Sequence, residues 1–173
     1  MLNLKKGKAL LIAEIGGNHE GDITKAKDLM ISASEAGADI VKFQTYTASG
    51  LVNKQLRSDR FEHFQKFTLE DDDWILIAED AKKNGINFSS SLWESRFIEL
   101  LDDYICLYKI GSGDISNHDL IDQFLELKKP VIFSTAMSTI DDIDRTMEFI
   151  ISRYPNIIQE NNLGILQCTA MYD

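Results

Sequence analysis

The segment EAGADIVKFQTY, residues 35–46, joins the end of a helix to a strand through one glycine. Upstream of it, apolar residues recur at helical spacing from about Asp22 to Ala36, and Gly37 stands where such a helix ends. Downstream, DIVKFQ (Asp39–Gln44) has the length and apolar character of a strand. The segment therefore predicts a helix followed directly by a strand.

The same alternation of strand and helix continues along the chain. Strands are predicted at 9–16, 39–44, 86–91, 105–110, 130–135 and 163–169, with helices at about 22–36, 70–84, 94–101, 117–128 and 140–154. This order predicts parallel strand pairing and an α/β fold. Alternation alone does not distinguish a doubly wound sheet from a barrel.

Composition excludes several classes of protein. The 173 residues, 44% of them hydrophobic, suffice for one domain with a core. A formal charge of −10 argues against nucleic acid partners, because phosphates would be repelled. No apolar run approaches the roughly 20 residues of a membrane span, and the first apolar stretch contains Glu14, unlike a signal peptide. We expect no membrane partner and a cytoplasmic location.

The two cysteines, Cys106 and Cys168, lie in apolar runs and show no CxxC spacing. This pattern predicts buried, reduced thiols with no metal or redox role.

Each predicted strand carries a polar side chain near its C-terminal end, on a face that begins apolar. Parallel strands covered on both faces are normally apolar throughout, and their C-terminal ends are where α/β enzymes build sites. Lys42 and Lys109 are the charged cases, accompanied by the hydroxyls of Ser91, Ser112 and Ser134. Together they predict a pocket for a small polyanion. The structural alternative is that Glu14 pairs with Lys42, and Asp114 with Lys109, as salt bridges.

Five blocks in order carry a resemblance to a known family: AEIGGNHEGD (13–22), EAGADIVKFQTY (35–46), YKIGSGD (108–114), KPVIFSTAM (129–137) and LGILQCTAMYD (163–173). Over almost its entire length the chain resembles the N-terminal barrel domain of the sialic acid synthase family. The resemblance implies a TIM (β/α)8-type barrel, here incomplete, with about six β/α units over residues 1–173. The family's last barrel strands and its small C-terminal antifreeze-like domain are absent from this sequence.

The resemblance also implies a reaction. The family condenses phosphoenolpyruvate with an N-acyl amino-sugar aldehyde, such as N-acetylmannosamine, to give a nonulosonic acid such as N-acetylneuraminate, and releases phosphate. It uses a divalent metal, Mn²⁺ or Mg²⁺, whose histidine ligands come from strands that this chain lacks, so no metal ligand is assigned. We expect the chain alone to lack synthase activity. We also expect a homodimer or higher oligomer through open barrel edges.

Residue roles follow from the same resemblance. It implies that Lys42 and Lys109 hold the phosphate and carboxylate of phosphoenolpyruvate, and that Glu14 and Gln44 face the reacting aldehyde. Catalytic roles are thus expected for Glu14, Lys42 and Gln44, and substrate-binding roles for Ser91, Lys109, Ser112, Asp114, Ser134, Tyr172, Asn18 and His19. Ala170 stands where many members have a polar residue, which shifts the expected sugar.

Two other functions stay open. Another phosphoenolpyruvate-dependent aldol synthase, such as one that makes octulosonate phosphate, would need extra basic loop residues, and few are found beyond Arg57, Arg60 and Arg96. The second is a non-catalytic fragment or assembly module that retains only the phosphoenolpyruvate pocket.

A long excursion separates the second predicted strand from the next long helix, from Thr45 to Leu69. Its phenylalanines, Phe61, Phe64 and Phe67, are spaced by three and predict a short helix packed on the barrel. A lid over the sugar and an oligomer contact are the alternatives.

Overall fold

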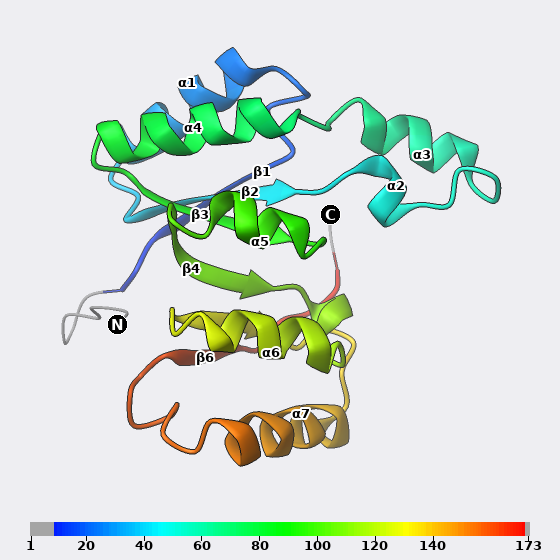
Figure 1. Ribbon diagram of the computed structural model, residues 1–173, viewed down its shortest axis with the longest axis vertical. Coiled ribbons are helices and arrows are strands. Elements are labelled where there is room, and N and C mark those ends of the chain that lie inside the picture. Colours follow the sequence, from blue (N-terminus) through cyan, green and yellow to red (C-terminus); the bar gives the residue numbers. More distant parts are fainter. Residues whose placement is uncertain (1–8, 172–173) are drawn as a thin grey trace. The chain divides into compact units, whose positions relative to one another are not determined.

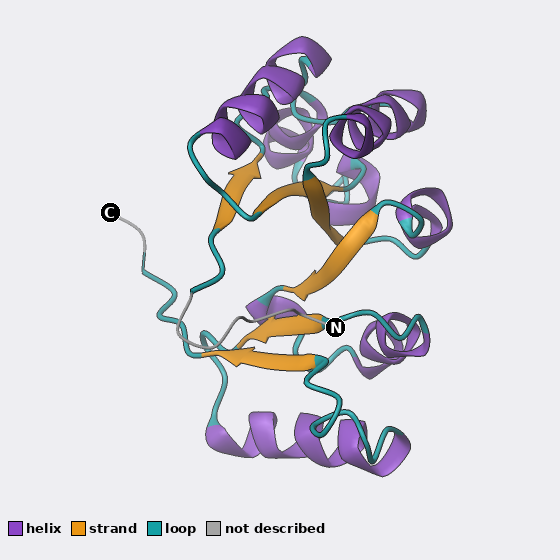
Figure 2. Cartoon of the chain, turned by 90° about the vertical axis from the view of Figure 1, so that its left-hand side faces the viewer, coloured by secondary structure: helices purple, strands orange, loops and turns teal. Residues whose placement is uncertain are grey.

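The computed structural model describes residues 9–171, which fall into two compact units. The N-terminal unit comprises residues 9–106 and the C-terminal unit residues 107–171. Each unit has its own strands and its own helices, and each is described by itself (Figures 1 and 2).

Three parallel strands form the sheet of the N-terminal unit, in the order β1-β2-β3. Its elements are β1 (Ile12–Gly16), α1 (Ile23–Glu35), β2 (Ile40–Thr45), α2 (Ala48–Leu51), α3 (Ser58–Gln65), α4 (Asp71–Lys83), β3 (Asn87–Leu92) and α5 (Arg96–Leu101). In the register of these strands Glu14 lies opposite Lys42, and Lys42 lies opposite Ser89. The polar residues predicted at the strand ends therefore come from neighbouring strands.

Helices α1 and α4 pack against each other and against these strands (Figure 1). The start of α1 is fixed by Asp22, whose carboxylate accepts hydrogen bonds from the N–H groups of Thr24 and Lys25. The helix ends at Glu35, and Gly37 follows with a φ of 94°, a conformation that glycine adopts without strain. The apolar sides of the two helices are fully buried at Ala26, Met30, Trp74, Ile77, Ala78 and Ala81.

The C-terminal unit also contains parallel strands in sequence order, β4-β5-β6. Its elements are β4 (Ile105–Ile110), which begins at the boundary between the units, the 3-10 turn η1 (Ser112–Asp114), α6 (His118–Glu126), β5 (Val131–Ser134), α7 (Ile140–Arg153) and β6 (Leu163–Leu166). The middle of α6 is joined to the end of α7 by Asp122, which accepts hydrogen bonds from the guanidinium of Arg153 at 2.8 and 2.6 Å.

All six predicted strands are confirmed, and three of them, β1, β5 and β6, are shorter than expected. β1 begins at Ile12, because the Leu11 N–H donates to the side chain of Asp39 at 2.8 Å instead of entering the ladder. β6 ends at Leu166, and residues 167–171 continue without regular structure.

The predicted burial of the cysteines is wrong. Cys106 and Cys168 are reduced, as expected, but both are partly exposed. Cys168 lies beyond the last strand, where its Sγ donates to the carbonyl of Leu166 at 3.4 Å.

Within residues 9–171, no helix combines the length and the apolar character that crossing a membrane requires.

Candidate functional site

Three side chains from neighbouring strands meet at the C-terminal ends of β1, β2 and β3. The Lys42 ammonium lies 2.8 Å from an oxygen of Glu14 and donates to the hydroxyl of Ser91 at 3.2 Å. Lys42 is only 3% exposed, so these partners replace much of the water that its charge has lost. We call Glu14, Lys42 and Ser91 the Lys42 cluster. The ion pair that the sequence suggested between Glu14 and Lys42 is confirmed.

Within the Lys42 cluster, the Glu14 carboxylate is the group that is exposed to solvent. The Glu14 side chain is 58% exposed, against 4% for that of Lys42. A second molecule can therefore reach Glu14 while the lysine stays in its buried position. Gln44 is half-buried and lies opposite Ser91 in the register of β2 and β3.

The loop after β1 holds the two other residues of the first motif. Asn18 is exposed, but His19 is 1% exposed. Its ring lies against Phe43 of β2 and, edge to face, against Trp74 of α4, with ring centroids 6.2 and 5.7 Å apart. His19 thus has almost no surface with which to contact the substrate that its motif predicts for it.

A second group of polar side chains lies at the C-terminal ends of β4 and β5. The Lys109 ammonium donates to the hydroxyl of Ser134 at 2.5 Å and to the carbonyl of Ile110 at 2.9 Å. Ser112 and Asp114 begin and end the 3-10 turn that follows β4, and the Ser112 hydroxyl accepts from the Ala136 N–H at 3.1 Å. We call Lys109, Ser112 and Ser134 the Lys109 group. The ion pair between Asp114 and Lys109 stays a prediction.

Two expectations have no test in this structure. Tyr172 lies outside the described residues. Between residues 9 and 171 no group of three or more His, Cys, Asp or Glu side chains is placed to hold a metal ion. The described residues therefore do not fit a divalent metal by themselves, and the predicted Mn²⁺ or Mg²⁺ stays a prediction for a longer protein.

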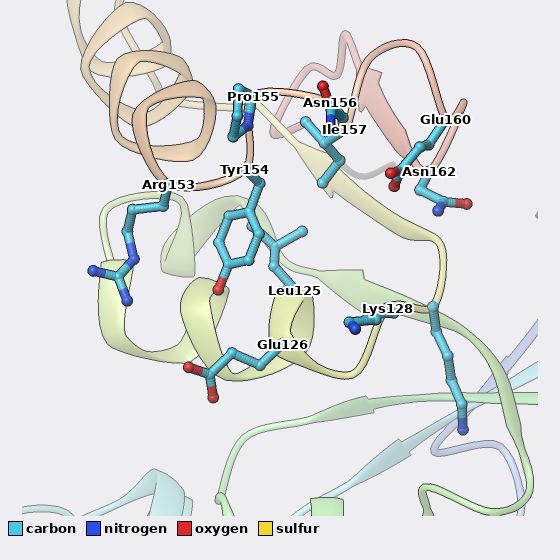
Figure 3. A pocket seen from close by; sticks show the side chains of 11 residues that line it. Leu125, Glu126, Lys128, Arg153, Tyr154, Pro155, Asn156, Ile157, Glu160 and Asn162 are labelled. Carbon is cyan, nitrogen blue, oxygen red and sulfur yellow. The ribbon is translucent and has the colours of Figure 1, made fainter.

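A cavity of about 690 Å³ lies at the other end of the C-terminal unit, where the chain enters β5 and β6 (Figure 3). It is lined by the last residues of α6 and α7 and by the segments that follow them, including Leu125, Lys128, Tyr154 and Ile157. The Tyr154 hydroxyl donates to Asp122 at 2.7 Å, and burial and this bond raise the pKa of Tyr154. None of the predicted site residues lines this cavity, so we assign it no part in the site.

Sequence reasoning missed the residues that hold the excursion. Glu94, which follows β3, accepts from the N–H of Thr47 at 2.7 Å and so fixes the chain as it leaves β2. The hydroxyls of Thr45 and Ser90 form a buried pair at 2.8 Å. Glu94 lies close to the C-terminal end of a strand, as the predicted site residues do. This position is a signal that could have identified it from the sequence.

The excursion itself contains two helices, α2 and α3, beyond the end of β2 (Figure 1). The predicted short helix exists, but α3 buries none of its residues fully. Phe64 packs edge to face on Tyr46 with ring centroids 5.6 Å apart, and Phe61 lies beneath the Lys54 ammonium at 5.1 Å. Helix α3 therefore packs less tightly on the rest of the N-terminal unit than the prediction of three packed phenylalanines implied. The lid and the oligomer contact stay predictions.

Comparison with known proteins now decides the family. The chain matches the NeuB family over residues 29–173, which is most of its length. The chain belongs to the NeuB family. It is also 33% identical to the N,N'-diacetyllegionaminic acid synthase of Legionella pneumophila over 175 residues, covering 94% of this chain and 49% of that protein.

Other NeuB relatives make different products. The pseudaminic acid synthase of Helicobacter pylori is 29% identical, with 88% of this chain and 53% of that protein covered. The N-acetylneuraminate-9-phosphate synthase of the mouse is 27% identical, with 96% and 48% covered. The chain spans about half the length of the curated relatives it matches.

Solved structures confirm the predicted fold class. The N-acetylneuraminic acid synthetase of Leptospira borgpetersenii aligns with a TM-score of 0.85 at 21% identity, over 99% of this chain and 59% of that one. A truncated 3-deoxy-D-arabino-heptulosonate 7-phosphate synthase of Thermotoga maritima aligns with a TM-score of 0.65 at 15% identity, over 98% and 58%. The NeuB chain is thus an α/β protein with the strand order of part of a TIM-type barrel.

Proposed function

We propose that this chain supplies the phosphoenolpyruvate-binding side chains of a nonulosonic acid synthase. The synthase joins phosphoenolpyruvate to an N-acyl amino-sugar aldehyde and releases phosphate. Membership of the NeuB family, whose named relatives are synthases of legionaminic, pseudaminic and sialic acids, supports the reaction class. The same proposal keeps the cytoplasmic location and the homo-oligomer as predictions.

The observation that carries the proposal is that Lys42 is buried and paired. A lysine that is 3% exposed is rare, because removing an ammonium from water is costly unless partners satisfy it. Here Ser91 and Glu14 do so, and Glu14 remains open to solvent. Because its carboxylate partner is exposed to solvent, the Lys42 ammonium can exchange Glu14 for an anionic ligand without itself changing position.

The chemistry divides among these side chains as follows. The methylene carbon of phosphoenolpyruvate attacks the aldehyde carbon, water adds at the former enol carbon, and phosphate leaves. In the proposal Lys42 and Lys109 hold the anionic groups and stabilise the charge that moves during the reaction. Their partners Ser91 and Ser134 orient the two ammonium groups. Glu14 lies beside Lys42 and faces the aldehyde as an acid-base or charge-stabilising group.

Two of the three arginines of the N-terminal unit are already paired with carboxylates, which favours an aldehyde without a phosphate group. Arg57 makes two hydrogen bonds to Asp59, at 3.1 and 2.9 Å, and Arg96 makes two to Asp71, at 2.9 and 2.8 Å. These guanidinium groups are already engaged by carboxylates and would have to leave them to bind a sugar phosphate. We therefore propose that the aldehyde substrate is an unphosphorylated N-acyl hexosamine, and not a phosphosugar of the kind that other phosphoenolpyruvate-dependent aldol synthases use.

The test is a calorimetric titration of the chain with phosphoenolpyruvate. We expect saturable binding, and we expect Lys42→Met and Lys109→Met each to weaken it by at least about tenfold, because a charged hydrogen bond contributes about 1.5–3 kcal/mol. Methionine keeps the length of the stem and removes the ammonium.

The matched control is Lys27→Met. Lys27 is also a partly buried lysine paired with a carboxylate, Asp80, at 2.7 Å, but it lies on α1. It should leave the affinity unchanged. Absence of binding in the native chain, or equal losses in all three variants, would contradict the proposal.

A further inference from the structure

The loop that joins β1 to α1 folds around a single buried imidazole. Hydrogen bonds from Asn18 N–H to Ile15 O at 3.0 Å and from Asp22 N–H to His19 O at 2.9 Å give this loop its turns. Inside it, Nδ1 of His19 accepts from the Gly21 N–H at 3.2 Å. Because Nδ1 is the acceptor, its lone pair is free of a proton, and the ring is neutral with its hydrogen on Nε2.

The same ring also touches the neighbouring strand. Phe43, on which His19 packs, follows Lys42 in β2 and pairs in register with Gly16 of β1. The register between β1 and β2 shifts between Glu14 and Gly16, so the strand leaves the sheet through an irregularity of the kind that re-aims side chains. His19 therefore joins the loop to the part of β2 that presents the lysine.

The outer side of the loop is fixed as well. A methyl group added at Gly21, whose φ is 77°, would lie 2.3 Å from the carbonyl oxygen of Lys66. The end of the excursion thus lies directly on the loop at Gly21. The His19 hydrogen bond within the loop and this close approach both limit the conformations that the loop can adopt.

We propose that His19 is a positioning residue, which holds the β1–α1 loop in the conformation that keeps the Glu14 carboxylate beside the Lys42 ammonium. It acts through Glu14 and touches no substrate itself, consistent with its 1% exposure. Only the part of this proposal that concerns phosphoenolpyruvate binding rests on the proposed function. Burial, with a smaller contribution from Lys25, lowers the pKa of His19 from 6.5, in agreement with a neutral ring.

The first test is the protonation state of the ring. Long-range proton–nitrogen correlation spectra of the 173-residue chain at neutral pH distinguish the two neutral tautomers from the imidazolium. We expect the neutral tautomer with hydrogen on Nε2. An imidazolium at neutral pH, or hydrogen on Nδ1, overturns the proposal.

The second test separates the acceptor from the ring. His19→Asn places an oxygen near the position of Nδ1 but removes the ring, whereas His19→Phe keeps a ring and removes the acceptor. We expect His19→Phe to raise amide exchange at Gly21 about tenfold, the loss of one hydrogen bond, and to shift the side-chain resonances of Lys42. His19→Asn should restore both.

The control for this comparison is Met30→Ala, a fully buried change in α1 away from the loop. It should lower the melting temperature and leave the Gly21 exchange relative to its neighbours and the Lys42 resonances unchanged. If it reproduces the effects of His19→Phe, or if His19→Phe has none of them, His19 does not position the loop.

Phosphoenolpyruvate titrations of the same variants then link the loop to the site. We expect His19→Phe to weaken binding about tenfold and His19→Asn to recover it. If the native chain does not bind phosphoenolpyruvate, the proposed function fails, but the exchange and resonance results still decide the role of His19. If the native chain binds and His19→Phe binds equally well, the positioning role is wrong.

Discussion

The Lys42 ammonium lies almost entirely out of water, so its two partners from β1 and β3 decide what its burial costs. Glu14 is the charged partner and the more exposed one. Its removal leaves a buried cation with only a hydroxyl, which is less favourable than removing both charges together.

We therefore predict that Glu14→Gln lowers the free energy of unfolding by about 1–2 kcal/mol, a value between those of exposed and buried ion pairs. Lys42→Met should recover part of this loss in the double variant. Guanidinium unfolding of the four proteins of this cycle measures the coupling. Additive losses would show that the pair contributes nothing beyond its separate residues.

His19 gives a prediction about pH. Its lowered pKa means that the unfolded chain binds a proton more readily than the folded one. Stability should therefore be fully present above the unfolded value near 6.5 and fall as the pH decreases toward the lower folded pKa. Lys25, which pairs with Glu20 at 2.8 Å, is the charged neighbour that adds to the effect.

Melting temperatures measured from pH 7.5 to about 5 check this direction, since a one-unit pKa shift alone corresponds to about 1.4 kcal/mol. The slope should be shallower in His19→Phe, which has no group to titrate at this position. An equal slope in both proteins would place its origin in other titratable groups.

Strand periodicity was sufficient to predict Lys42 and its neighbours from sequence. Side chains alternate along a strand, so residue spacing alone assigns a lysine near a strand end to one face of the sheet. The same reasoning could not place His19. Its burial depends on Trp74, a residue of a helix far along the chain, and loop sequence does not indicate which ring will cover it.

Among the elements, the β1–α1 loop and the end of the excursion form one packed layer at Gly21 and Lys66. We predict that Gly21→Ala lowers the melting temperature more than Gly37→Ala does. Both glycines have positive φ, at 77° and 94°, but only Gly21 has a carbonyl oxygen in the way.

The backbone strain common to both substitutions is about 1–2 kcal/mol. Any excess at Gly21 measures the displacement of Lys66 and should accompany faster amide exchange over the end of the excursion. Equal melting temperatures for the two variants would mean that the excursion moves away without cost.

Helix ends were the easier part of the element prediction, because local side chains determine them. Asp22 at the start of α1 and Gly37 after its end are both visible in the sequence. The excursion was harder. The spacing of its phenylalanines indicated a helix, but the hydrogen bond between Glu94 and Thr47, which fixes the chain as it leaves β2, joins segments that no local pattern connects.

For the whole chain, the comparison of lengths gives the most direct expectation. The NeuB chain covers 49% of the Legionella synthase and 48% of the mouse synthase. We predict that the 173-residue chain binds phosphoenolpyruvate but produces no nonulosonic acid from N-acetylmannosamine, with or without manganese.

A coupled assay for released phosphate measures this turnover. The physical reason is that the described residues offer no group of three or more side chains to hold the metal that the family resemblance implies. Robust product from the purified chain would overturn the prediction.

At this scale the repeated local pattern predicted the α/β class and all six strands, whereas the choice of a barrel over a doubly wound sheet came from the family resemblance. It predicted less well where strands stop. The ends of β1 and β6 depend on which backbone groups find partners, and the Asp39 side chain takes the place of one such partner.

Helix α3 buries no residue fully, and Leu56 just before it is 78% exposed. Because the side chains of this stretch make few contacts with the rest of the protein, many amino acids can replace them. The stretch is therefore suited to protein engineering. Once the partly exposed Cys106 and Cys168 are replaced, a cysteine introduced at Gln55 could carry a fluorescent dye, because this side chain is exposed and lies outside both named groups. The NeuB chain thus offers its own attachment point for a reporter of ligand binding.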